Sequence, residues 1–196
     1  RQHIAEVAAG RRGAAAGGAG GAASGETVAG GSAAASFGSL GSLTEEAVEA
    51  ALQGDEAALL AWLDSGGRAN ATCVVGGVSG YTPLMLAANY GRERAVELLL
   101  QRGAEIDKQD GMGSTALLLA AGAGKERVVD LLLQRGAQVN LQNRNGVTAL
   151  MGAAIDGHPA VVLRLLRAGA DTKLRSERGK TALQWAKEKG HAECVR

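Results

Sequence analysis

The chain has very few aromatic residues. Phe, Trp and Tyr make up 3% of its 196 residues, whereas hydrophobic residues as a whole make up 46%. A core must therefore be built from Ala, Leu and Val, which suits small helices in close contact. The same shortage argues against a large pocket lined by aromatic side chains.

Strong net charge and long apolar runs are also lacking. The formal net charge is +1, so no overall field draws the chain to nucleic acid or to an anionic membrane. No run approaches the ~18 apolar residues that a transmembrane helix requires. We therefore expect neither nucleic acid nor a membrane among the partners, and we expect a monomer.

Cysteine is scarce as well. Two residues, Cys73 and Cys194, are too few for a disulfide framework. In a stack of helices spaced about 8–10 Å apart they lie several units from each other, beyond the ~7 Å that a disulfide can bridge. Free thiols indicate a reducing compartment, which is the cytoplasm or the nucleus.

One phrase recurs along the chain. It reads GYTPLMLAANYGRERAVELLLQRGAE, GSTALLLAAGAGKERVVDLLLQRGAQ, GVTALMGAAIDGHPAVVLRLLRAGAD and, shortened, GKTALQWAKEKGHAECVR. Its threonines lie 33 residues apart, at Thr82, Thr115, Thr148 and Thr181. A fixed period of this length indicates a stack of supersecondary units that cannot bury their apolar faces alone.

Each unit predicts a pair of helices. Thr82 supplies an N-cap oxygen, and Pro83 stands at the first helical position, where its missing N–H costs nothing. Gly91 ends this helix where a positive φ is expected. A second helix runs from about Arg92 to Arg102. Its apolar stripe, which we expect to point inward, is Val96, Leu99 and Leu100, and in the next two units Val128, Val129, Leu132 and Leu133, then Val161, Val162, Leu165 and Leu166.

The first unit begins near Ser42. The letters Ser-Leu-Thr-Glu from Ser42 have capping-box spacing, although Thr44 is an equally good N-cap. A short helix ending at Gly54 and a second one ending at Gly66 follow. This unit lacks the Thr-Pro-Leu entry and is acidic, as expected of a capping unit with one face in water.

Two stretches depart from the period. The connection from Gly67 to Thr82 is three residues longer than its counterpart from Gly103 to Thr115, and glycines flank Val74 and Val75 in it. We expect an extended, longer finger there. Residues 1–41 are rich in Gly, Ala and Ser with almost nothing to bury, which predicts a flexible tail or linker and no phosphate-binding loop.

From these residues the chain resembles the ankyrin repeat family. The likeness covers about Thr44 to Arg196 and rests on the 33-residue period, Thr-Pro-Leu at Thr82–Leu84, the paired alanines and the Leu-Leu-x-x-Gly-Ala endings. It implies an all-α solenoid of about four to five stacked helix-turn-helix units with projecting hairpin-like loops. The domain would span 42–196, with repeats at about 42–77, 78–110, 111–143, 144–176 and, shortened, 177–196.

The resemblance also implies a binding surface. Ankyrin repeats generally bind other proteins on the concave surface that the loop tips and the first helices make. Carried over position by position, the partner-binding residues are Tyr81, Asn89, Tyr90, Met112, Ser114, Arg144, Asn145, Ile155, Asp156, Arg178, Lys180, Glu188 and Lys189. We expect a partner segment with an apolar end over the two tyrosines and an acidic end over Arg178 and Lys180.

One position departs from the family pattern. A histidine that often follows the threonine by three residues, and is thought to link neighbouring loops, is replaced by Met85, Leu118, Met151 and Gln184. The family can also be hydroxylated on an Asn after a Val at the end of the second helix, and Asn140 is the one residue here that matches.

The residues show no catalytic, cofactor or metal motif. His158 and His191 are separated by the repeat period, so they are interpreted as equivalent structural positions. The sequence therefore predicts a non-catalytic scaffold for protein–protein interaction. The alternative is a substrate-recruiting module of a larger enzyme, a kinase or a ubiquitin ligase, whose catalytic domain lies outside this chain.

Overall fold

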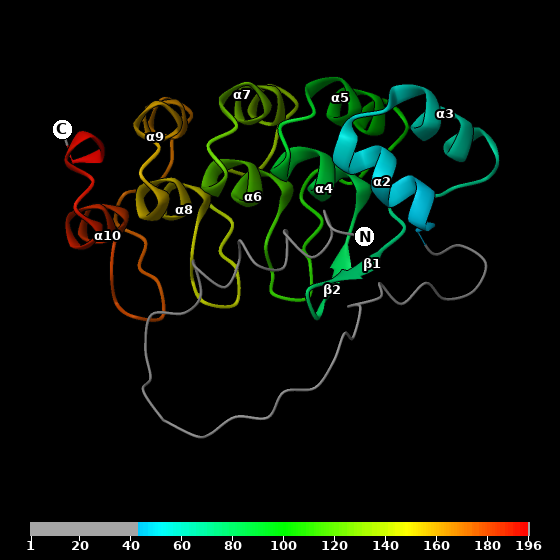
Figure 1. Cartoon of the computed structure of the whole chain (residues 1–196). Coiled ribbons are helices and arrows are strands. Elements are labelled where there is room, and N and C mark those ends of the chain that lie inside the picture. The colour runs from blue at the N-terminus through cyan, green and yellow to red at the C-terminus, as the bar shows by residue number, and fades with distance from the viewer. Residues whose placement is uncertain (1–42, 196) are drawn as a thin grey trace, which may run out of the picture.

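The computed structural model describes residues 43–195. The tail predicted at 1–41, the candidate cap Ser42 and Arg196 lie outside this range. Within it the helices form two rows (Figure 1). The inner row consists of α2 (Glu45–Gln53), α4 (Pro83–Asn89), α6 (Ala116–Gly122), α8 (Ala149–Asp156) and α10 (Ala182–Lys189). The outer row consists of α3 (Glu56–Asp64), α5 (Glu93–Gln101), α7 (Glu126–Gln134), α9 (Pro159–Arg167) and the one-turn helix η1 (Ala192–Cys194).

Each inner helix packs against the outer helix that follows it and against the inner helices on either side. Consecutive outer helices also contact one another. The result is the stacked, helical solenoid that the period predicts. It is extended along one direction, with α2 and α3 at one end and α10 at the other (Figure 1).

Threonine side chains start the inner helices as predicted. Thr82, Thr115, Thr148 and Thr181 each accept a hydrogen bond from the backbone N–H three residues on. At α2 the cap is Thr44, which accepts from Ala47 N at 3.2 Å. Pro83 occupies the first turn of α4, and Gly91 has φ +72°. These local signals fix where each helix begins and ends because they satisfy backbone groups that the helix leaves unpaired.

The core lies between the two rows and is built from Ala, Leu and Val. Leu99, Leu132 and Leu165 are fully buried. The next leucine of each pair is less buried. Leu100 and Leu133 are half-buried against the core, whereas Leu166 is 41% exposed, so the prediction that this leucine points inward was wrong for Leu166. Adjacent residues on a helix point about 100° apart, so the second leucine of each pair stands at the edge of the buried face.

Between an outer helix and the next inner helix the chain runs out and back as a loop, called a finger here. All fingers project on the side of the inner row (Figure 1). The finger before α4 is an antiparallel hairpin of β1 (Cys73–Val75) and β2 (Val78–Tyr81), with Cys73 opposite Tyr81. The predicted extended finger is therefore confirmed, and it adds a small sheet to an otherwise helical fold.

The fingers before α6 and α8 are tight turns that an Asx side chain closes. In the finger before α6, Asp110 Oδ1 accepts from Met112 N and from Ser114 N, both at 2.8 Å. In the finger before α8, Asn143 Oδ1 accepts from Asn145 N at 3.0 Å and from Val147 N at 2.9 Å. These bonds hold the finger tips rigidly, because each carboxylate or amide oxygen replaces a backbone acceptor.

Neighbouring fingers are joined by a backbone ladder. Gly111 N donates to Ser79 O at 2.7 Å. In the next two steps Arg144 N donates to Met112 O and Glu177 N donates to Asn145 O, both at 2.9 Å. Glutamines add to it, since Gln109 Nε2 donates to Gly113 O and to Gln142 O, and Gln142 Nε2 donates to Gly146 O and to Arg175 O.

This network links the loops although the expected histidines are missing. Met85 and Met151 at their positions are buried instead. The two histidines that are present join repeats at another place. His158 Nε2 lies 3.0 Å from Gly122 O, and His191 Nε2 lies 3.0 Å from Ile155 O. Each ring thus reaches the end of the preceding inner helix, which confirms the structural interpretation of both residues.

Candidate functional site: the concave surface

The finger tips and the exposed side of the inner row form one continuous surface, called the concave surface here. Most of the predicted binding residues lie on it with accessible side chains. Those exposed are Arg144, Asn145, Asp156, Arg178, Glu188 and Lys189, and those half-buried are Asn89, Tyr90, Met112, Ile155 and Lys180.

Two predicted residues do not lie on this surface. Tyr81 is 1% exposed and Ser114 is 3% exposed. Both stand at the base of a finger directly before an inner helix, where the chain turns into the core. Tyr81 is also held by its pairing with Cys73 in the hairpin. The prediction that Tyr81 anchors a partner was therefore wrong, because its side chain contributes to the core.

The ladder places one residue of each finger in a row. Ser79, Met112 and Asn145 each use their carbonyl to accept from the next finger, and Arg178 follows one period later. The row therefore runs from a small hydroxyl through a thioether and an amide to a guanidinium. A partner lying along the fingers would meet these side chains in that order.

The N-terminal half of the concave surface is apolar and small. Tyr90 ends α4, where its N–H donates to Leu86 O at 3.2 Å, and its ring is half-buried against the core. Gly122 and Ala123 stand at the matching place on α6. A tyrosine beside small residues offers one large contact and room for a partner to approach closely.

The C-terminal half is charged and contains a residue that the sequence interpretation missed, Trp185 on α10. Its ring is 7% exposed. Lys180 Nζ lies 4.8 Å and Arg178 Cζ lies 5.7 Å from the ring centroid. An aromatic residue a few positions after two finger cations is a signal that could have revealed this cluster.

Electrostatics in this half follow from the same cluster. The hydrogen bond from Lys180 lowers the pKa of Glu188, and the charges of Lys189 and Arg178 lower it further. Nearby on α8, partial burial raises the pKa of Asp156, while the charges of His158, Lys189 and His191 oppose that shift. Glu188 is thus held ionised, whereas Asp156 gives up its proton less readily than a carboxyl that water surrounds completely.

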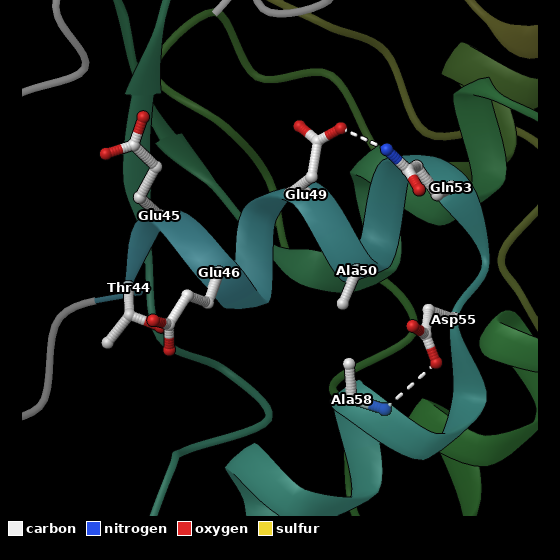
Figure 2. Close-up of a pocket in the computed structure, with 8 residues that line it drawn as sticks. All are labelled: Thr44, Glu45, Glu46, Glu49, Ala50, Gln53, Asp55 and Ala58. Carbon is white, nitrogen blue, oxygen red and sulfur yellow. Dashed lines mark hydrogen bonds between the residues drawn. The ribbon is translucent and has the colours of Figure 1, made fainter.

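A hollow lies at the N-terminal end of the solenoid, between α2 and α3 (Figure 2). Its volume is about 660 Å³ and its charged lining comprises Glu45, Glu46, Glu49 and Asp55. Glu49 accepts a hydrogen bond from Gln53 Nε2, and Asp55 caps α3 by accepting from Ala58 N at 3.0 Å. The hollow is open and lined by carboxylates that cap or flank helices, as a capping unit requires.

Residues 43–195 contain no group of three or more His, Cys, Asp or Glu side chains arranged to hold a metal ion. No helix in this range is long and apolar enough to cross a membrane. Cys73 and Cys194 are both free thiols. Asn140 is exposed, and its Oδ1 accepts from Asp171 N at 2.8 Å, so it joins two successive repeats.

The comparison with known families agrees with the geometry. The family model described as ankyrin repeats (3 copies) matches residues 47–143 and 125–196. Among curated proteins none matches the chain significantly. Matched residues cover well over half of the chain, and they include the repeated helix pairs, their capping threonines and the fingers. The chain belongs to the ankyrin repeat family.

Proposed function

We propose that the chain is a non-catalytic scaffold that binds a partner protein through its concave surface. Ankyrin repeats are generally protein–protein interaction modules. The observation that carries the proposal is the row of finger tips. A backbone ladder fixes it before any partner arrives, yet its side chains differ from repeat to repeat. A rigid frame with variable side chains favours affinity and selectivity, because little ordering entropy is lost on binding.

Tyr90 is the apolar anchor of this surface, because the side chain of Tyr81 is buried in the core. Met112, half-buried on the neighbouring finger tip, adds flexible apolar area. A partner segment would place apolar side chains there and run toward Arg178. We further propose that the protein is a monomer and that it works in a reducing compartment. The two free thiols support the reducing compartment.

The test begins with capture of binding proteins from a cell extract by the full chain. Affinity of the purified partner is then measured by calorimetry for the original chain, for Tyr90→Ala and Met112→Ala, and for Gln134→Ala on the outer row. We expect each concave variant to weaken binding by about tenfold or more and the outer variant to leave it unchanged. Equal affinity of all variants, each folded by circular dichroism, would refute the proposal.

A further inference from the structure

Trp185 holds two cations at the C-terminal end of the concave surface. Lys180 and Arg178 both stack on its ring, at 4.8 and 5.7 Å from the centroid. Burial fixes the ring, and its Nε1–H donates to Ser176 Oγ at 3.3 Å. Because the ring is buried and hydrogen-bonded, it positions the two cations in the free protein.

The two cations differ in whether they already form an ion pair within the protein. Lys180 forms an ion pair with Glu188. Arg178 is exposed, and no residue from 43 to 195 forms an ion pair with it. A guanidinium presents its donors as a planar fork that matches a carboxylate. Arg178 is therefore a positioned donor, and Glu188, whose pKa its charge helps to lower, already pairs with Lys180.

Neighbouring charges restrict the anion to a short one. Lys189 adds a third cation near Glu188. The exposed carboxylates of Glu177 and Asp156 are interleaved with these cations. A polyanion such as nucleic acid, with one charge every ~1.7 Å of duplex, would meet repulsion at each of them. A segment with only one or two carboxylates can contact the cations without lying next to Glu177 or Asp156.

Apolar surface continues from the cluster toward the middle of the solenoid. Val147 and Ile155, one period before Lys180 and Glu188, are half-buried against the core. A segment that reaches Arg178 would therefore lie over apolar side chains in the preceding repeat. This neighbourhood favours an acidic residue flanked by apolar ones.

We infer that Arg178 and Lys180, held by Trp185, bind the carboxylates of a short acidic segment of the partner protein. The inference rests on the proposed function and adds the class of side chain that is recognised at this end. It deepens the expectation drawn from charge alone, because the ring explains why these two cations form one site.

The two tryptophans give the experiment its readout. The chain has two Trp residues, Trp185 and Trp62, which lies on α3 at the far end of the solenoid. Their indole N–H signals are followed in a proton–nitrogen NMR spectrum of the full chain, with Trp62→Phe assigning them. The probe is the peptide Gly-Ser-Gly-Leu-Glu-Glu-Leu-Gly-Ser-Gly, and the control peptide has Gln in place of each Glu.

We expect the Glu peptide to shift the Trp185 indole saturably and to leave Trp62 unmoved, and the Gln peptide to shift neither. Arg178→Gln with Lys180→Gln should weaken the apparent affinity by about tenfold. Arg167→Gln with Lys173→Gln removes the same charge from α9 and the loop after it and should have little effect.

Three results would overturn the inference. They are an unmoved Trp185 signal, equal weakening by both double variants, and a stronger response to oligothymidylate than to the Glu peptide. None of them touches the proposed function, which fails only if the Tyr90 and Met112 variants bind the captured partner normally.

Discussion

Gly146 lies at a finger tip where two constraints meet. Its φ is +68°, and a Cβ built there would lie 3.0 Å from the backbone nitrogen of Glu177 in the next finger. Glycine is required both for the left-handed turn and for the close approach of the two fingers. The residue thus links the shape of one turn to the ladder that joins the tips.

Gly179 provides a matched control, since its φ is +71° but no atom lies within 4 Å of a Cβ built there. We expect Gly179→Ala to lower the free energy of unfolding by about 1–2 kcal/mol, the cost of the left-handed conformation. Gly146→Ala should cost about 1–3 kcal/mol more, because the next finger must shift. Urea unfolding followed by circular dichroism measures both. Equal losses would mean that the contact between fingers is not tight.

Cys73 illustrates how burial sets the chemistry of a single residue. It is 5% exposed, and burial raises the pKa of its thiol to about 11. Cys194 is half-buried, and burial with the charge of Glu193 raises its pKa too. Iodoacetamide should therefore label Cys194 first and Cys73 only on unfolding. Rapid labelling of Cys73 in the folded protein, read by mass spectrometry, would show that the hairpin opens.

The same shift predicts a pH dependence. The thiol ionises at the ordinary pKa of 9.0 when unfolded and at about 11 when folded, so the unfolded state loses its proton first. Ionisation of Cys73 therefore leaves the free energy of unfolding unchanged below pH 9 and lowers it as the pH rises from 9 toward 11, because the thiolate is favoured in the unfolded state. Relative to Cys73→Ala, the original chain should lose on the order of 2 kcal/mol over this window. Parallel curves for the two proteins would contradict the shift.

At the scale of the helix, burial of one leucine in each pair carries the packing. Leu132 is fully buried, and Leu163 is 48% exposed on the next outer helix. We expect Leu132→Ala to lower the free energy of unfolding by about 2–5 kcal/mol and Leu163→Ala to change it by no more than about 0.5 kcal/mol. A loss below half a kcal/mol for Leu132→Ala in urea melts would show that the assigned face is wrong.

The helix pairs could be predicted from the sequence because their signals are local. A capping threonine, Pro83 at the first turn and a glycine with positive φ act within a few residues of each helix end. The burial predicted for Leu166 was wrong, because burial at this position depends on which helix lies beside α9. There η1 is a single turn, and local sequence does not state how much of a neighbouring helix will form.

The concave surface could be predicted only in part, for a related reason. Finger-tip positions follow from the period, so Arg144, Asn145 and Arg178 lie exposed on the fingers where the period puts them, and their part in binding stays a prediction. Tyr81 and Ser114 are buried because both stand at the base of a finger, where the chain turns into the core, and the period does not state which finger positions are buried. Trp185 was missed because its equivalents in other repeats, Leu86 and Gly152, are buried residues of the inner helices. Its contacts with Arg178 and Lys180 arise only when the finger before α10 places these cations over the ring.

At the scale of the molecule, coupling between repeats has two components. Exposed ion pairs join successive outer helices, such as Arg102 with Asp64 at 2.7 Å and Arg135 with Glu97 at 2.6 Å. Such pairs contribute little individually. The buried contacts between rows and the ladder between fingers therefore dominate, and together they make the concave surface one rigid body rather than a set of separate loops.

The central claim is that this concave surface, and not the outer row, meets the partner. A photoreactive amino acid in place of Asn145 on a finger tip, compared with one in place of Gln134 at the exposed end of α7, tests it most directly. We predict that the captured partner is cross-linked through position 145 and not through position 134. Cross-linking through position 134 alone, or equally through both, would contradict the account.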